Sequence, residues 1–184
     1  MPKRPVESTT ALRLVNHGPT VMVTAGSGET ANIITLAWLT PVSISPPMIG
    51  IAVAPPRHTH DLIRKAGEFV VNVPSAALLD AVWHCGRVSG RDGDKFESAG
   101  LTPEPALSVG APRIAECFAH IECRVVSAPT TGDHTFFVGQ IAAAAAEEGA
   151  FDGHLRMSDR YQTLHHLGGR RFVTPLGTEL EAPA

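Results

Sequence analysis

Apolar and β-branched residues occur along the chain in short runs that are separated by glycine and proline. Residues 21–25 and 31–40 are two such runs on either side of Gly26-Ser-Gly, a combination typical of a β-hairpin with a flexible tip. Residues 48–54 and 68–73 predict two further strands, each bounded by proline. This pattern favours β structure over a few long helices.

The clearest alternation lies at residues 117–125, where odd positions are small or apolar and the even positions from 120 onward are His120, Glu122 and Arg124. It predicts a half-buried strand whose odd positions face the core and whose even positions face solvent. Residues 135–141 predict its antiparallel neighbour across a Pro- and Gly-containing turn at residues 128–133. The alanine run 142–146 is expected to be the frayed end of that neighbour.

Two short peripheral helices are predicted between the strands. The first spans residues 59–66, with Thr59 as N-cap and Gly67 beyond the end, and the second spans about residues 75–86. Many short strands with short helical inserts suggest a closed or split barrel.

Length and charge narrow the class of protein. The chain has 184 residues, for which one domain is the default, and we expect a core at about residues 11–175. The net charge of −3 gives none of the basic surplus that nucleic-acid binding requires. No apolar stretch is long enough for a membrane span, and the first ten residues lack the apolar region of a secretory signal, so we expect a cytoplasmic protein.

The three cysteines form no C-x-x-C pair and are expected to be reduced, with Cys117 and Cys123 as small core residues on one face if they share a strand. The nine histidines match no ligand framework, so we expect no metal site. The chain also lacks G-x-G-x-x-G, P-loop and G-x-S-x-G motifs.

Two segments could hold a phosphate group. At residues 54–62, Arg57 and Thr59 could complete a phosphate cradle at a helix N-terminus, although Thr59 could equally serve only as a cap. In the glycine-punctuated loop at residues 89–96, Arg91 could make forked contacts and Lys95 could add a charge. The alternative for this loop is a solvated segment whose charges pair with its own aspartates.

A third candidate is His134, which opens the predicted strand after the turn. A histidine there could orient a nicotinamide or shuttle a proton at neutral pH. The alternative is a surface histidine beside an acidic turn residue.

Taken in order, several motifs resemble the flavin reductase-like family, and in particular its flavoredoxin-like branch. The resemblance covers about residues 19–172 and rests on Asn32-Ile-Ile-Thr-Leu-Ala-Trp, Pro41-Val-Ser-Ile-Ser-Pro-Pro, Phe69-Val-Val-Asn-Val-Pro, Ser89-Gly-Arg-Asp with Asp94-Lys-Phe, and Gly132-Asp-His-Thr. It implies a mainly β, Greek-key type FMN-binding split barrel with short peripheral helices.

The resemblance also implies where a flavin lies. FMN, with FAD as the alternative, is expected in a groove at the interface of a homodimer. The strand that begins at Asn32 would face the flavin ring, His134 would orient NADH or NADPH, and Tyr161 with residues 164–169 would return over the site. The expected ring contacts are Thr35, Leu36, Ala37 and Trp38, and the expected phosphate-side residues are Arg57, His58, Thr59, Ser89, Gly90, Arg91 and Lys95.

The implied function is an NAD(P)H-dependent flavin reductase that moves hydride or electrons through FMN to free flavin, ferric iron, a quinone or an activated C=C bond. A monooxygenase or redox protein is a conceivable partner. Two alternatives stay open, namely an electron-transfer flavoprotein served by a protein donor and a non-catalytic flavin-binding protein.

Overall fold

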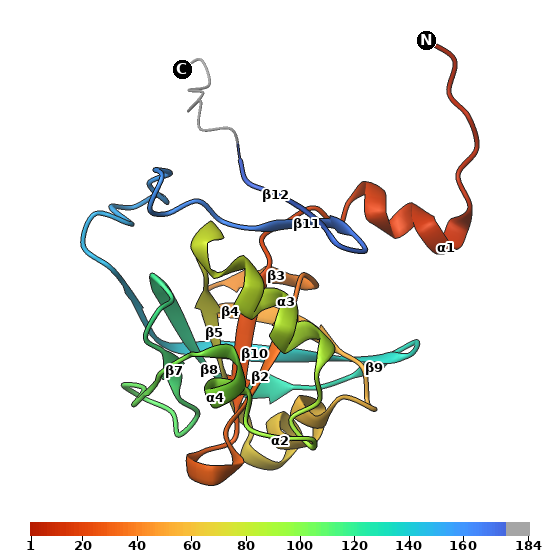
Figure 1. The fold of residues 1–184 in the computed structure, drawn as a ribbon. Helices are drawn as coiled ribbons and strands as arrows, with labels where there is room; N and C mark the ends of the chain where they lie inside the picture. Colours follow the sequence, from red (N-terminus) through yellow and green to blue (C-terminus); the bar gives the residue numbers. More distant parts are fainter. Residues whose placement is uncertain (176–184) are drawn as a thin grey trace.

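An eight-stranded antiparallel sheet forms the body of the protein in the computed structural model, which describes residues 1–175 (Figure 1). The strand order is β2-β1-β5-β8-β10-β4-β3, with β9 paired to β10. These strands are β1 (Val21–Ala25), β2 (Asn32–Leu36), β3 (Leu39–Ile44), β4 (Pro47–Val53), β5 (Glu68–Val73), β8 (Ala119–Ser127), β9 (Thr130–Thr131) and β10 (His134–Ala146). The sheet curls into a half-barrel, which confirms the mainly β split barrel. Residues 176–184 of the expected domain lie outside the described residues.

The barrel is split between β2 and β3, the two ends of the strand order. Residues 31–40, expected as one strand, form two, and the chain breaks at Ala37 and Trp38. The reason is a change of partner. β2 pairs with β1, whereas β3 pairs with β4 at the other end of the sheet, so the backbone must turn away from one neighbour before it meets the next.

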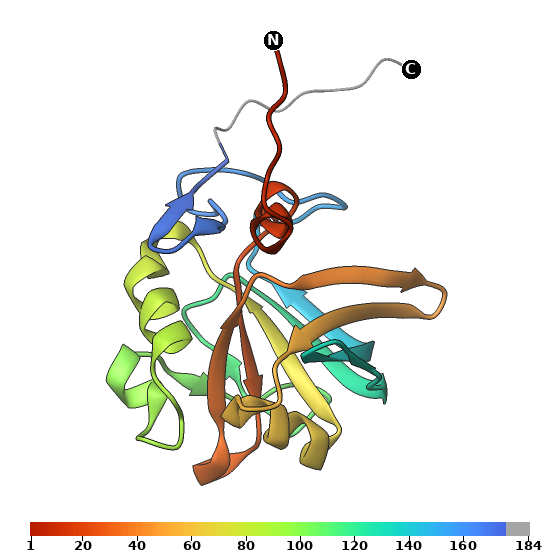
Figure 2. The ribbon, with the colours of Figure 1, turned by 90° about the vertical axis from the view of Figure 1, so that its right-hand side faces the viewer.

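Short helices and hairpins surround the sheet (Figure 2). They are α1 (Ser8–Ala11), η1 (Leu12–Leu14), η2 (Gly28–Thr30), α2 (His58–Ala66), η3 (Ala76–Leu78), α3 (Leu79–Arg87), α4 (Lys95–Ala99), β6 (Pro103–Glu104), β7 (Arg113–Ile114), β11 (His165–Gly168) and β12 (Arg171–Val173). The prediction that Thr59 caps α2 is wrong, because the N-cap is Arg57 and the Thr59 side chain points into the protein. Gly67 ends the helix in the left-handed conformation, as expected.

The core lies on both sides of β1, which is why every residue of that strand is buried. Val21, Val23 and Ala25 belong to the barrel interior, whereas Met22 packs with α3, α4 and Leu164 in a second cluster. Helix α3 is thereby held against the outside of the sheet, beside the split.

The predicted solvent face of residues 117–125 is wrong for His120 and Glu122, which are both buried. A loop between β6 and β7 covers that face, and the Glu122 carboxylate accepts hydrogen bonds from Leu107 N (2.8 Å) and Ser108 N (2.6 Å). Cys117 and Cys123 are buried as expected, but Cys117 precedes β8 and lies in a different cluster from Cys123, so they share no face.

The alanine run is a paired part of β10, and the expectation of a frayed end is wrong. Ala143 to Ala146 pair with Glu122 to Ala119 of β8. Register shifts at Val138/Gly139 and Ile141/Ala143 bend this long strand and keep its two halves in register with β8. Within residues 1–175, no helix is long and apolar enough to cross a membrane.

Candidate functional site

A groove of about 410 Å³ runs along the split of the barrel. Its walls come from β2 and the break after it, from the end of β4, and from single residues of five other segments. The lining residues are Asn16, Ile34, Thr35, Leu36, Ala37, Trp38, Ala52, Val53, Ala54, Arg57, Gly86, His134 and His166. All four residues expected to contact a flavin ring therefore lie together in one groove, where an edge strand also presents backbone groups.

Trp38 and His134 form one end of this groove. Their ring centroids are 4.7 Å apart, and His134 Nδ1 lies 2.7 Å from Asp133 Oδ1. The hydrogen bond from His134 lowers the pKa of the exposed Asp133 carboxyl below its ordinary value. The hydrogen bond between His134 Nδ1 and the Asp133 carboxylate thus fixes the orientation of the His134 ring.

Asn16 is a groove residue that sequence reasoning did not identify. With its amide oriented so that donors face acceptors, Asn16 donates to Ala37 O (3.0 Å) and its oxygen accepts from Trp38 Nε1 (2.7 Å). It therefore holds the indole at the break between β2 and β3. A single asparagine in an irregular segment gives no sequence signal for such a role.

A smaller pocket of about 140 Å³ continues from the groove, with which it shares Ile34, Arg57 and Gly86. We call it the cationic pocket. Its remaining lining includes Asn32, His58, Thr59, Cys85, Arg87, Ser89, Gly90 and Lys95, so the structure brings β2, the start of α2, the end of α3 and the 89–95 loop to one place.

The orientation of the Thr59 hydroxyl follows from its buried partner. Asn32 Nδ2 donates to Thr59 Oγ1 over 2.8 Å, so the Thr59 proton is available to a ligand. Asn32 Oδ1 is buried and has no hydrogen-bond partner among the described residues. A Cβ at Gly90 would stand 2.1 Å from this oxygen, which means that only glycine lets the loop approach so closely.

Positive charge converges on the cationic pocket. Burial, and then the Arg91 charge, lowers the pKa of His58. Burial also lowers the pKa of Lys95, with a smaller contribution from Arg57, while Lys95 Nζ donates to Ile33 O (2.7 Å) and Cys85 O (2.9 Å). Lys95 therefore lines the pocket, where a charge was expected, and its buried hydrogen bonds also join β2 to α3. A bound anion would relieve this crowding of cations.

Arg91 lies at the rim and does not line the cationic pocket. Its guanidinium donates to Pro56 O and Asp61 Oδ2, both at 3.0 Å, so its forked contact is made with the chain itself. The expected pairing with loop aspartates is wrong in detail, because Asp61 of α2 is the partner and Asp94 caps α4. Arg87, which sequence reasoning did not identify, lines the pocket from the last turn of α3.

The C-terminal segment reaches the site in part. His166 lines the groove, as the expected return of residues 164–169 requires. Tyr161 does not, because its ring packs on Phe118 and its hydroxyl donates to Glu148 O (3.1 Å). Within residues 1–175, no group of three or more His, Cys, Asp or Glu side chains could hold a metal ion.

The two connected cavities fit the FMN expected from the sequence. Three cations, two hydroxyls and a helix N-terminus form a donor set suited to a phosphate, and Arg57 lies where the cavities meet. The larger groove has the apolar walls and backbone edge that a flavin ring requires.

Comparison with known proteins agrees with this geometry. An uncharacterised protein of Pyrococcus abyssi is 40% identical over 88% of this chain and 92% of its own length. An NADH-dependent FAD reductase of Streptomyces globisporus is 34% identical over 69% of this chain and 68% of its own length.

Solved structures resemble the whole fold. A flavoredoxin from Methanosarcina acetivorans superimposes with a TM-score of 0.86 at 28% identity, over 99% of this chain and 95% of its own. An FMN-binding protein from Thermus thermophilus, solved with bound 1-cyclohex-2-enone, gives 0.83 at 27% identity, over 100% of this chain and 99% of its own. The family model described as "Flavin reductase like domain" matches residues 13–165, and the chain therefore belongs to the flavin reductase-like family.

Proposed function

We propose that this protein binds FMN without a covalent bond and transfers hydride or electrons from NADH or NADPH to a second acceptor. The observation that carries the proposal is the continuity of the apolar groove with the cationic pocket, which together match a planar ring joined to a phosphate. The NADH-dependent FAD reductase among the relatives supports the nicotinamide donor.

The chain's residues bind and orient, while the flavin supplies the hydride chemistry. Thr59, Arg57 and Arg87 would hold the phosphate. The backbone of residues 35–38 and the Trp38 indole would border the ring, and His134, anchored by Asp133, would orient the nicotinamide. No side chain needs to form a covalent bond to substrate.

A homodimer would complete the groove. The β3–β4 hairpin, coloured orange in Figure 2, projects from the body, and Ile44 near its tip is 95% exposed. A second copy could bury this arm and close the open side of the split. A light-scattering mass of one chain with FMN tightly bound would contradict this arrangement.

An electron carrier is the second candidate, favoured by the close similarity to a flavoredoxin structure. Such a carrier would take electrons from a protein donor and would not meet nicotinamide. An activated C=C bond is one acceptor class for the enzyme, since the similar FMN-binding protein was solved with an enone.

An anaerobic absorbance spectrum separates these candidates. The FMN-loaded protein is measured before and after NADH and then NADPH are added. Bleaching of the flavin band by either supports the oxidoreductase and names its donor, whereas a bound flavin that stays oxidised contradicts it. His134→Ala is expected to keep its FMN and to be reduced more slowly, with His17→Ala, an exposed histidine, as the control.

A further inference from the structure

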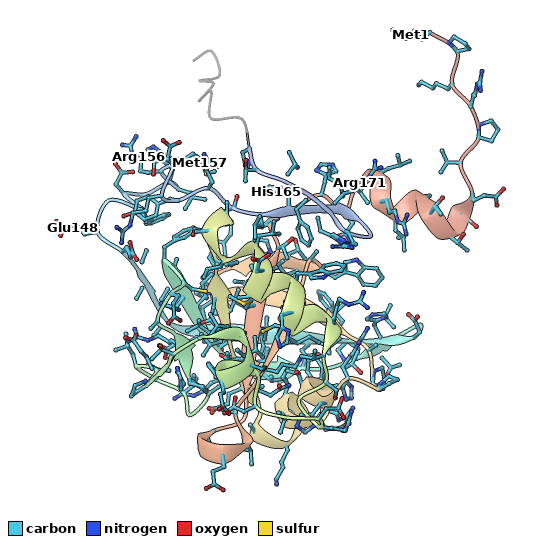
Figure 3. All side chains as sticks on the ribbon, in the orientation of Figure 1. Met1, Glu148, Arg156, Met157, His165 and Arg171 are labelled. Atoms are coloured by element: carbon cyan, nitrogen blue, oxygen red, sulfur yellow. The ribbon has the colours of Figure 1, made fainter. Side chains whose placement is uncertain are left out.

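A third cavity, of about 200 Å³, opens beside the groove between α3 and the β11–β12 hairpin. Figure 1 shows this hairpin above α3, and Figure 3 labels His165 and Arg171 at its two strands. We call this cavity the side pocket. It shares Thr35, Ala37, Gly86 and His166 with the groove, so a molecule in it would lie next to the proposed flavin site.

The walls of the side pocket suit a single flat ring. The Trp83 and Phe172 rings pack edge to face, with centroids 6.3 Å apart and planes at 88°. The ring centroid of His166 lies 5.0 Å from that of Phe172. A cavity of about 150 Å³ is known to accept benzene. The side pocket therefore has room for one ring with a substituent and is too small for a three-ring flavin.

A buried hydroxyl in this pocket has no partner. Thr20 is 2% exposed, its backbone N–H donates to Leu164 O, and its Oγ1 has no hydrogen-bond partner among residues 1–175. Buried polar groups in native proteins are nearly always hydrogen-bonded, so this one points to a ligand oxygen. Thr35, the other hydroxyl of the lining, already donates to Val82 O (2.6 Å).

The charge at the pocket is positive. The Arg87 guanidinium lies 5.2 Å from the Trp83 ring centroid and that of Arg170 lies 5.9 Å from it. Trp83 forms a wall of the side pocket, and two guanidinium groups lie close to its indole ring. This positive charge favours an anionic ligand in the pocket.

We infer that the side pocket binds a single-ring organic anion, of the aromatic carboxylate class, with its ring against Trp83 and Phe172. An oxygen of the anion satisfies the Thr20 hydroxyl, and its charge faces Arg87. This site goes beyond the proposed function. It shares Arg87 with the cationic pocket, but five of its lining residues belong to neither flavin cavity, namely Thr20, Val82, Trp83, Gly169 and Phe172.

The test is a ¹⁹F NMR titration with 4-fluorobenzoate, carried out on the chain without FMN and again with FMN saturating. Saturable binding is expected in both. Neutral 4-fluorobenzyl alcohol is expected to bind more weakly, and two-ring 6-fluoro-2-naphthoate is expected to be excluded by size. Thr20→Val, which removes only the hydroxyl, is expected to weaken 4-fluorobenzoate about 2- to 10-fold.

Thr40→Val is the matched control, because Thr40 is exposed and lies outside the side pocket. Phe172→Leu is a second variant in case Thr20→Val does not fold, and it is expected to weaken binding through loss of the aromatic wall. Absence of saturable binding, or equal affinity in folded Thr20→Val, would overturn the inference.

Displacement of the probe by FMN would also overturn it, because the cavity would then belong to the flavin site. FMN binding is measured separately by quenching of flavin fluorescence. Probe binding without FMN binding would leave this inference standing while the proposed function failed.

Discussion

Gly90 decides how closely the 89–94 loop approaches β2, and through that the shape of the cationic pocket. Gly90→Ala places a methyl group against Asn32 Oδ1, 2.1 Å away, so Asn32 and its partner Thr59 must move. We expect FMN binding to weaken by about 1–3 kcal/mol, the usual cost of overpacking. Flavin fluorescence titration measures it. Gly18→Ala, with nothing within 4 Å of its Cβ, is the control, and equal affinities in the two variants would contradict the role of Gly90.

Arg87 and Arg91 lie on neighbouring segments, and comparing their variants distinguishes a contact with the ligand from a contact within the protein. Arg87 lines the cationic pocket, whereas Arg91 is bonded to Pro56 and Asp61. Arg87→Ala is expected to weaken FMN binding by about 1.5–3 kcal/mol, the scale of a hydrogen bond to a charged group. Arg91→Ala should weaken it less, since it removes only a brace of the loop. Flavin fluorescence titration measures both affinities. A larger loss of FMN affinity in Arg91→Ala than in Arg87→Ala would mean that Arg91, and not Arg87, contacts the phosphate.

At the scale of elements, one buried and one half-buried carboxylate, on two strands, hold the loop between β6 and β7. Glu122 of β8 binds Leu107 N and Ser108 N, and Glu68 of β5 binds Gly110 N (2.6 Å) and Ala111 N (3.1 Å). A period of two cannot reveal this, because the alternation records polarity and not whether a distant loop covers the polar face.

Glu122→Gln tests this bracing. An amide in place of the carboxylate presents a donor to one of the two loop N–H groups, and the charge-assisted bonds are lost. The free energy of unfolding is expected to fall by about 1.5–3 kcal/mol. Urea denaturation measures the change, with the exposed Glu29→Gln as control. A midpoint equal to that of the control would show that the loop is not braced by Glu122.

At the scale of the whole molecule, loops and helices packed on the sheet bury histidines, and this makes stability depend on pH. Burial, followed by the Arg113 charge, lowers the pKa of His120 below its ordinary 6.5, and burial also lowers that of His58. The unfolded chain then binds protons more readily than the folded one. Stability is therefore fully present above pH 6.5 and is lost as pH falls from there through the folded pKa values.

This dependence is checked by urea denaturation at pH 7.5 and pH 5.0. His120→Gln cannot titrate, so its stability should fall less between these two pH values than that of the natural chain. His17→Gln, at an exposed position, should keep the natural pH dependence. If His120→Gln loses as much stability between pH 7.5 and pH 5.0 as the natural chain does, other groups are responsible for the acid sensitivity.

The molecule as a whole is organised around the split. β2 and β3 follow each other in the chain yet end the strand order, so the groove, the cationic pocket and the side pocket all open near their junction or beside β2. Asn16, Ala54 and His166 reach this groove from segments far apart in the sequence.

The sequence by itself determined the β class, most strand positions, the end of α2 at Gly67 and the segments that meet at the site, because local spacing and turn residues specify these features. Only the tertiary structure decided that residues 31–40 break at Ala37, that Glu122 is buried, that Arg87 lines the cationic pocket in place of Arg91, and that Asn16 holds Trp38. Each of these depends on which distant segment lies opposite a side chain, and a linear pattern carries no information about that neighbour.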